Sequence, residues 1–238
     1  MAKRVRSFRH RLQRILLWLL SVWFAATIGS VLLLRFVPPP TSAFMLERHI
    51  AAWRQGDHGF RLHQRWVPRA KITPLVPLAM VAAEDQKFPQ HHGFDVSAIR
   101  DALDKAGNNG RLRGASTISQ QTAKNLFLWS GRSFVRKGLE AYFTILIETL
   151  WPKQRILEVY VNIAELGDGI YGVAAASEAY FGVPPSRLTP HQSALLAATL
   201  PNPRRLHAVN PSAYVQRRAT WIERQMRQLG GTGYVGDW

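Results

Sequence analysis

The apolar residues of this chain follow two kinds of pattern: one unbroken run near the N-terminus and a series of helical stripes after it. The run covers residues 15–34, twenty positions without a charged side chain. At a rise of 1.5 Å per residue, a helix of that length spans about 30 Å, the thickness of the hydrocarbon core of a bilayer. The pattern therefore predicts a transmembrane anchor at residues 15–37.

A cleaved signal peptide shares the basic start and the apolar core of this region, so it is the alternative interpretation. The run is longer than a signal-peptide core, and it ends in Arg35 and the prolines at 38–40 without a small-x-small cleavage site. We therefore predict an uncleaved anchor. Residues 1–14 contain six Lys and Arg and no acidic residue. By the positive-inside rule they form a cytoplasmic basic tail, and the chain after the span lies on the opposite side of the membrane.

The rest of the chain has the pattern of a linker followed by one mainly α domain. Residues 38–64 begin with a stiff proline spacer, and we interpret them as a linker leading into a domain at residues 65–238. Apolar stripes with helical spacing, together with capping signals, predict the helices of this domain. Their expected ranges are 73–84, 95–105, 117–127, 139–150, 156–164, 189–200 and 212–229. We recognise no hairpin signal and no alternating strand.

The charge balance narrows the class of partner. The 238 residues include 31 Lys and Arg against 15 Asp and Glu, a formal net charge of +16. Such an excess favours anionic partners: nucleic acid, a lipid surface or a phosphorylated substrate. The chain contains no cysteine, which excludes disulfides and thiolate metal sites.

The first candidate for chemistry is an acidic pair at the end of an apolar helix. Glu84 and Asp85 follow small apolar residues at the end of the helix predicted at 73–84. A carboxylate there faces the negative end of the helix dipole, which raises its pKa and suits a proton acceptor. The alternative is a polar helix end that caps the next loop. A metal site with His91 and His92 is disfavoured, because Glu-x6-His is not a recognised zinc spacing.

Two polar clusters follow. Residues 114–125 offer hydroxyls, amides and an ammonium at the start of a predicted helix, which suits a sugar-phosphate ligand; a solvated face is the alternative. Residues 132–140 combine cations with Glu140, and they overlap an apolar group at 127–135. Apolar side chains bordered by cations are typical of a surface that dips into a lipid interface. Taken alone, the Arg136–Glu140 spacing indicates only an i,i+4 surface pair worth a few tenths of a kcal/mol.

Two further blocks complete the series. Glu158 and Asn162 share one face of a helix within residues 153–162 and are more typical of structure than of reactivity. Residues 167–172 and the following 180–182 read as a turn followed by tight helix packing.

In this order and spacing, the five blocks resemble the five signatures of the peptidoglycan glycosyltransferase domain, glycosyltransferase family 51. They include E-D-x-x-F-x-x-H-x-G at 84–93, G-x-S-T-I-S-Q-Q at 114–121, R-K-x-x-E at 136–140 and K-x-x-I-L-E-x-Y-x-N at 153–162. Two departures are visible: Ser119 stands where the family has Thr, and Gln192 stands where a Glu is common. The transpeptidase strings S-x-x-K and K-T-G do not occur, so the match is to the monofunctional type.

The resemblance implies a mainly α, two-lobed fold similar to lysozyme. The expected reaction polymerises lipid II, undecaprenyl-pyrophosphoryl disaccharide-pentapeptide, into a β-1,4-linked glycan by inverting transfer, releasing undecaprenyl pyrophosphate. Glu84 would be the general base. Glu140 would be a second catalytic carboxylate that holds cations or, through the substrate pyrophosphate, a Mg²⁺ or Mn²⁺ ion. The expected substrate-binding residues are Asp85, Phe88, His91, Gly93, Gly114, Ser116, Thr117, Gln120, Gln121, Lys124, Asn125, Arg132, Arg136, Lys137, Lys153, Glu158 and Asn162.

The resemblance also implies a location and partners. The protein is expected in the bacterial inner membrane with a single span, its N-terminus cytoplasmic and its catalytic domain periplasmic. Expected partners are lipid II, the growing glycan strand, the bilayer, and cell-wall synthesis or division proteins, but not nucleic acid. One alternative is a membrane-anchored, lysozyme-like enzyme that cleaves glycan, which has no use for the cations at 132–137. The other is a non-enzymatic basic tether, whose salt-sensitive binding would survive the loss of Glu84.

Overall fold

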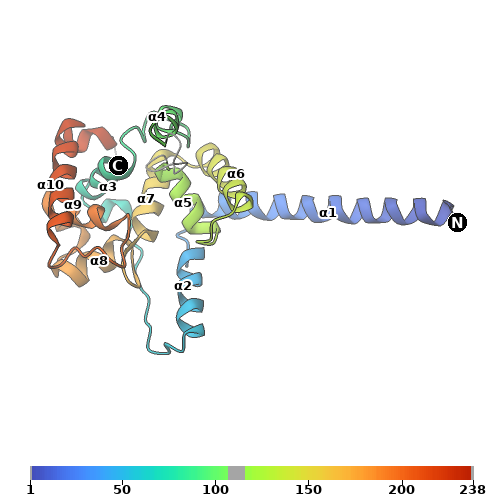
Figure 1. Ribbon diagram of the computed structural model, residues 1–238, viewed down its shortest axis with the longest axis horizontal. Helices are drawn as coiled ribbons and strands as arrows, with labels where there is room; N and C mark the ends of the chain where they lie inside the picture. The colour runs from blue at the N-terminus through green and yellow to red at the C-terminus, as the bar shows by residue number, and fades with distance from the viewer. Residues whose placement is uncertain (1, 107–115, 237–238) are drawn as a thin grey trace. The chain divides into compact units, whose positions relative to one another are not determined.

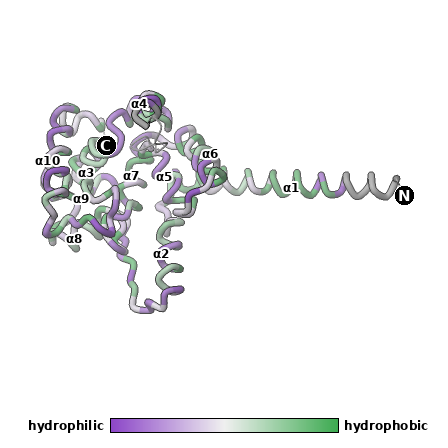
Figure 2. Tube along the Cα trace, in the orientation of Figure 1, coloured by the Kyte–Doolittle hydropathy of each residue, from purple (hydrophilic) through white to green (hydrophobic). Residues whose placement is uncertain are grey.

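The computed structural model describes residues 2–106 and 116–236, which divide into two compact units, Met1–Pro38 and Pro39–Trp238. The first unit is one helix, α1 (Ala2–Leu34). Its part from His10 to Leu34 has a mean hydropathy of 2.1 and is long and apolar enough to cross a membrane. Figure 2 shows the hydrophobic colour along the C-terminal part of α1. This helix is consistent with the predicted anchor.

The second unit is mostly helical, as predicted from the stripes (Figure 1). Its helices are α2 (Ala43–Arg54), α3 (Leu75–Glu84), α4 (Val96–Ala106), α5 (Ile118–Phe127), α6 (Phe134–Leu150), α7 (Lys153–Ile163), α8 (Gly172–Phe181), α9 (Pro190–Thr199) and α10 (Ala213–Gln228). Short 3-10 turns occur at η1 (Arg69–Lys71), η3 (Pro185–Arg187) and η4 (Gly231–Val235). One group of helices packs α3, α9, α10 and η4 together, and the other packs α2 and α6 on α5, with α7 between them.

Local capping signals set where two of the predicted helices begin. At α5, Thr117 accepts a hydrogen bond from the Gln120 backbone, and the Gln120 side chain accepts one from the Thr117 backbone. Thr189 and Gln192 form the same capping box at α9. Each box satisfies two backbone N–H groups that a helix start leaves unpaired. Gln192 therefore has a structural role through its amide oxygen, although it departs from the family pattern.

Helix α3 is the buried centre of its group. Every residue from Val76 to Ala82 is buried, so the helix is apolar on all sides rather than along one stripe. A helix of this kind must be surrounded by protein, and α7, α9 and α10 pack against it. Its C-terminal end therefore delivers Glu84 from the interior of the unit.

The sequence-based expectation of no hairpin is wrong. Strands β2 (Glu165–Gly167) and β3 (Ile170–Tyr171) pair antiparallel around an Asp168–Gly169 turn, and β1 (His63–Gln64) pairs parallel with β3. Gly169 has a φ of 72°, a left-handed conformation that suits an Asp-Gly hairpin turn. Strands of two and three residues are too short to show an alternating pattern, so only the turn was visible in the sequence.

Helix α2 occupies part of the segment that the sequence left unassigned. Ser42 caps it by accepting a hydrogen bond from the Met45 backbone N–H at 3.2 Å. The helix packs on α5, and the Glu47 carboxylate accepts hydrogen bonds from the Ser130 backbone N–H and hydroxyl at 2.7 and 2.6 Å. These bonds fix the loop between α5 and α6 to α2.

Candidate active site

Glu84 is the last residue of α3, and two neighbours contact its carboxylate. Gln121 Nε2 donates to one oxygen at 2.9 Å, and an Arg218 guanidinium nitrogen lies 3.3 Å from the other. The Tyr160 hydroxyl donates to Gln121 Oε1 at 3.0 Å, which leaves the amide nitrogen directed at Glu84. Burial raises the pKa of Glu84, while the bond from Gln121 and the charges of Arg218 and Lys124 oppose that rise. The result is a carboxylate with increased basicity that its neighbours help to keep ionised.

Arg218 is the residue of this centre that the sequence interpretation missed. It lies on α10, 134 positions from Glu84 along the chain. The sequence around it reads as an ordinary basic, amphipathic helix. Its contact depends on the packing of α10 against α3, which no local pattern predicts.

Asp85 has a different function from its neighbour, because both of its oxygens bind other parts of the fold. They lie 2.9 and 3.0 Å from His91 Nε2, and one of them also accepts the Ile118 backbone N–H at 2.9 Å. Gly93 N–H donates to His91 Nδ1 at 3.1 Å, so the ring proton sits on Nε2 and points at Asp85. The acidic pair thus divides into one carboxylate that contacts Gln121 and Arg218 and one that joins the end of α3 to the start of α5.

Gly93 also helps to hold the loop after α3 against the start of α5. Its φ is 89°, and its carbonyl accepts a hydrogen bond from the Thr117 hydroxyl at 2.6 Å. A Cβ at this position would lie 2.7 Å from Cγ2 of Thr144 on α6. The loop therefore needs glycine both for its backbone conformation and for the close approach of α6.

The next contacts attach α7 to the same region. The Phe88 side chain is buried, and Lys153 Nζ lies 4.5 Å from the centre of its ring. Lys153 also donates to Glu148 at 2.8 Å. The hydroxyl of Ser119 donates to the same carboxylate, so the serine that departs from the family pattern keeps a hydroxyl function.

A second buried carboxylate lies in the other helix group. Glu140 on α6 pairs with Arg136 through one oxygen, at 2.6 Å, and with Lys137 through the other. Lys124 on α5 responds electrostatically to both carboxylates: burial lowers the pKa of its ammonium, whereas Glu140 and Glu84 both raise it. Both carboxylates, Glu84 and Glu140, therefore act on the ammonium of Lys124.

Of the remaining predicted site residues, some hold the fold together and others are exposed. Asn162 exchanges hydrogen bonds with the backbone of Val67 at 2.9 and 3.0 Å, and Glu158 accepts the Arg69 backbone N–H at 2.9 Å. These two residues hold the segment before α3 against α7. Ser116 and Arg132 are exposed, Asn125 is half-buried, and Gly114 lies outside the described residues.

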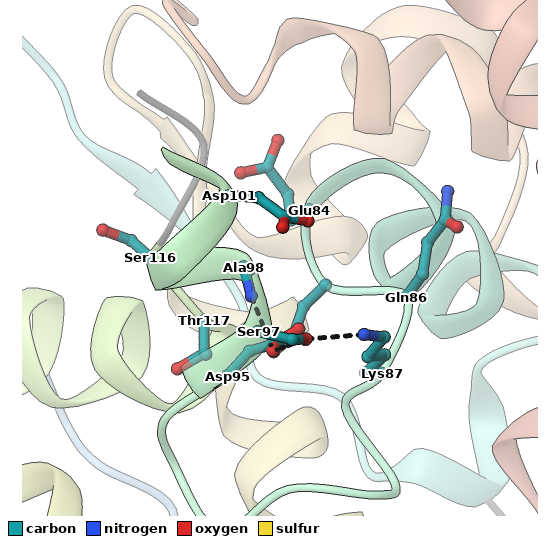
Figure 3. A pocket seen from close by; sticks show the side chains of 10 residues that line it. Glu84, Gln86, Lys87, Asp95, Ser97, Ala98, Asp101, Ser116 and Thr117 are labelled. Carbon is teal, nitrogen blue, oxygen red and sulfur yellow. Dashed lines mark hydrogen bonds between the residues drawn. The ribbon is translucent and has the colours of Figure 1, made fainter. Parts of the chain in front are cut away.

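A hollow of about 220 Å³ lies beside Glu84, between the end of α3 and the starts of α4 and α5 (Figure 3). Glu84, Asp95, Asp101 and Ser116 give it a polar lining. Its rim is fixed where Lys87 donates to the Ser97 hydroxyl at 2.6 Å. A second hollow, of about 450 Å³, is lined by residues of α2, the α5–α6 loop and the α9–α10 loop. It includes Phe44, whose ring centre lies 5.4 Å from Lys124 Nζ.

The contacts do not fit a metal held directly by these carboxylates. Within residues 2–106 and 116–236, no group of three or more His, Cys, Asp and Glu is arranged to hold an ion. Both oxygens of Glu140 are already paired with cations, and His91 faces Asp85. The expectation of Mg²⁺ or Mn²⁺ therefore has no support from a protein ligand set.

The apolar segment at 127–135 is divided between core and surface. The Phe127 ring stacks on Phe143 at 4.5 Å, and Leu128 is buried, so these two side chains pack inward. Trp129, Phe134 and Val135 are 44%, 98% and 71% exposed. Only the second set is available to a lipid surface.

Comparisons with known proteins agree with this geometry. The family model described as Transglycosylase matches residues 52–227. The chain is 58% identical over 228 residues to a biosynthetic peptidoglycan transglycosylase of Xanthomonas campestris, covering 94% of this chain and 93% of the relative. It is 55% and 56% identical to proteins of the same name from Stutzerimonas stutzeri and Citrobacter koseri, covering 97% and 96% of this chain and 93% of each relative.

The family expected from the five blocks is thus confirmed, and so is its mainly α, lysozyme-like fold. The matched region contains Glu84, Lys124, Glu140 and Arg218. The chain belongs to the transglycosylase family, as a monofunctional peptidoglycan glycosyltransferase.

Proposed function

We propose that this protein polymerises a lipid-linked disaccharide into peptidoglycan strands, with Glu84 as the general base. Glu84 takes the proton of the acceptor sugar's 4-hydroxyl while that oxygen attacks the anomeric carbon of the donor. The bond between that carbon and the pyrophosphate oxygen breaks, and the lipid pyrophosphate leaves. An α-linked donor gives a β-linked product in this single displacement, so no covalent enzyme intermediate is required. The observation that carries the proposal is a largely buried carboxylate, whose pKa burial raises, beside a polar hollow.

The neighbours of Glu84 have complementary functions in this step. A base must be ionised before it can accept a proton, and burial alone would favour the protonated form. Arg218 and Gln121 stabilise the carboxylate, which keeps it available without removing the basicity that burial supplies. General base catalysis of this kind contributes roughly 10²–10⁴-fold to rate.

The leaving pyrophosphate needs positive charge as it departs. Lys124 is well suited because its ammonium is buried and shares the field of Glu84 and Glu140. Arg132 is exposed just before the start of α6, whereas Arg136 and Lys137 are paired with Glu140. We assign Lys124 and Arg132 to direct contact with pyrophosphate, and Glu140 to fixing the other two cations.

In the proposed reaction a divalent metal ion binds only together with the substrate pyrophosphate. A Mg²⁺ or Mn²⁺ ion would neutralise pyrophosphate charge when both are bound, and the described residues offer no direct ligand set for it. The two hollows give room for two glycan ligands, one beside Glu84 and one beginning at Phe44.

We propose that the bilayer is the surface on which this reaction occurs. The basic residues 1–14 support a cytoplasmic N-terminus and a periplasmic domain in the inner membrane. Besides Trp129, Phe134 and Val135, helix α2 exposes Leu46, Ile50 and Trp53 at i, i+4 and i+7 spacing. Because Glu47 binds Ser130, these two apolar sets belong to one fixed part of the unit, and they are suited to shallow contact with lipid.

The function is tested with purified protein, lipid II and Mg²⁺, and in parallel with finished glycan strands. The proposal predicts long glycan products from lipid II, resolved by size, and unchanged finished strands. Shortening of finished strands without polymerisation of lipid II would instead support the lysozyme-like alternative, which no observation here favours.

A further inference from the structure

The chain after α10 turns back onto the end of α3. Gly230 and Gly231 have φ values of 94° and 73°, and these left-handed residues reverse the chain between α10 and η4. Helix η4 then packs against both α3 and α10. Its Tyr234 hydroxyl donates to the carbonyl oxygen of Gln86 at 2.6 Å and accepts from Gln90 Nε2 at 3.2 Å.

Gln86, two residues after Glu84, is therefore held from three directions. Its side-chain nitrogen donates to the Ala82 carbonyl at 3.2 Å and to Gln225 Oε1 at 3.0 Å. Gln225 lies on α10, the helix that also carries Arg218 to the Glu84 carboxylate. Helix α10 thus contacts the loop that follows Glu84 through Gln225 and the Glu84 carboxylate through Arg218.

We infer that Tyr234 is a positioning residue for Glu84, acting by latching the loop at 86–90 to the C-terminal segment. The inference rests on the proposed role of Glu84 as general base. The matched family region ends at residue 227, so Tyr234 lies beyond it. The latch is therefore a feature that the family match does not assign.

The physical reason lies in the end of α3. The last turn of a helix leaves carbonyl groups without intrahelical partners, and such ends open more readily than the interior. The Gln86 side chain satisfies the Ala82 carbonyl, and Tyr234 satisfies that of Gln86. With the Tyr234 hydroxyl removed, the end of α3 moves more freely, and more water reaches the Glu84 carboxylate, which is 18% exposed with the latch in place.

A looser end of α3 should also change the pH dependence of the rate, which a loss of stability alone would not do. The groups that face Glu84 are Arg218 from α10, Lys124 and Gln121 from α5, Tyr160 from α7, and Asp85 beside it. Across the hollow lie Asp101 of α4, Asp95 just before α4, and Lys87. Burial is the largest influence on the pKa of Glu84, and it raises that pKa. More water at the carboxylate therefore moves the pKa back toward its ordinary value. The acidic limb of the pH–rate profile then shifts to lower pH.

The test compares the full-length Tyr234→Phe variant with wild type in lipid II polymerisation. Tyr214→Phe, at an exposed tyrosine of α10, is the matched control. We expect Tyr234→Phe to lower kcat by roughly three- to tenfold, because small misplacements of catalytic groups reduce rate strongly. KM and melting temperature should change little, the acidic limb should move to lower pH, and Tyr214→Phe should match wild type. Gln225→Leu should change kcat and the limb in the same directions.

Two results would overturn the inference. One is an unchanged kcat and pH profile in Tyr234→Phe. The other is a loss of rate that only follows a lower folded fraction, with the acidic limb in its original place. Glu84→Gln is assayed in the same series. An active Glu84→Gln variant would refute the role of Glu84 as base. An inactive Glu84→Gln variant together with a Tyr234→Phe variant that behaves like wild type would refute only the role of Tyr234.

Discussion

Arg218 on α10 lies 3.3 Å from the Glu84 carboxylate at the end of α3, a contact between two helices far apart in the sequence. The pair is partly accessible, with side-chain exposures of 22% and 18%. Burial makes Glu84 basic, and Arg218 counteracts the burial enough to favour an ionised base. The activity of this site should therefore depend on the arginine as well as on the carboxylate.

The first prediction concerns the charge of Arg218. Its guanidinium lowers the pKa of Glu84, so Arg218→Met lets burial raise that pKa further. A base with a higher pKa is protonated at a higher pH, so the acidic limb of kcat should move to higher pH and turnover at neutral pH should fall. Turnover of lipid II measured from about pH 5 to 9 checks this. Arg217→Met, at the exposed neighbour, is the control, and a limb that stays in place or moves down contradicts the account.

The second prediction concerns Gly93, in the loop that joins α3 to α4. Gly93→Ala places a Cβ near Thr144 in a left-handed conformation, and we expect a cost of about 1–3 kcal/mol. For a chain of this size, that lowers the melting temperature by roughly 2–10 °C. Gly138→Ala is the matched control: Gly138 lies inside α6 with open space around its Cβ position. Alanine there should stabilise the protein by about 0.5–1 kcal/mol. Equal melting temperatures for the two variants would contradict the structure.

The third prediction concerns the exposed apolar residues. The chain contains no cysteine, so a single cysteine can carry a fluorescent label without removing others. In vesicles, a label at Phe134→Cys should be quenched by nitroxide lipids, whereas one at Thr220→Cys on α10 should not. The double variant Trp129→Ser with Phe134→Ser should keep its melting temperature, because both side chains are exposed. Equal quenching at the two positions, or a fall of several degrees, would argue against lipid contact.

The fourth prediction concerns the anchor. Residues 1–37 lie outside the matched family region, and all the groups around Glu84 belong to the second unit. Deleting residues 1–37 should leave an enzyme that polymerises detergent-solubilised lipid II but works poorly on vesicles. A protein that is folded by circular dichroism yet inactive in detergent would show that the first unit contributes to the site.

The sequence predicted those features that depend on neighbours along the chain. The capping box at Thr117, the Thr189-Pro190 start and the apolar stripes predicted helices, and the acidic pair predicted Glu84 as the candidate base. Features that depend on distant packing were missed. Arg218 reaches Glu84 only because α10 packs on α3, and Asp85 binds the start of α5 only because α5 begins beside it. The hairpin at Asp168 was missed because its strands are too short to show a pattern.

The most direct test of the central claim is the polymerisation rate of Glu84→Gln on lipid II, with products resolved by size. Glutamine keeps the shape of the side chain and removes only the proton acceptor. We predict a loss of at least about 100-fold in turnover, with the fold and donor binding retained, because general base catalysis contributes roughly 10²–10⁴-fold. A variant that keeps more than about a tenth of wild-type turnover would contradict the assignment of Glu84 as the base.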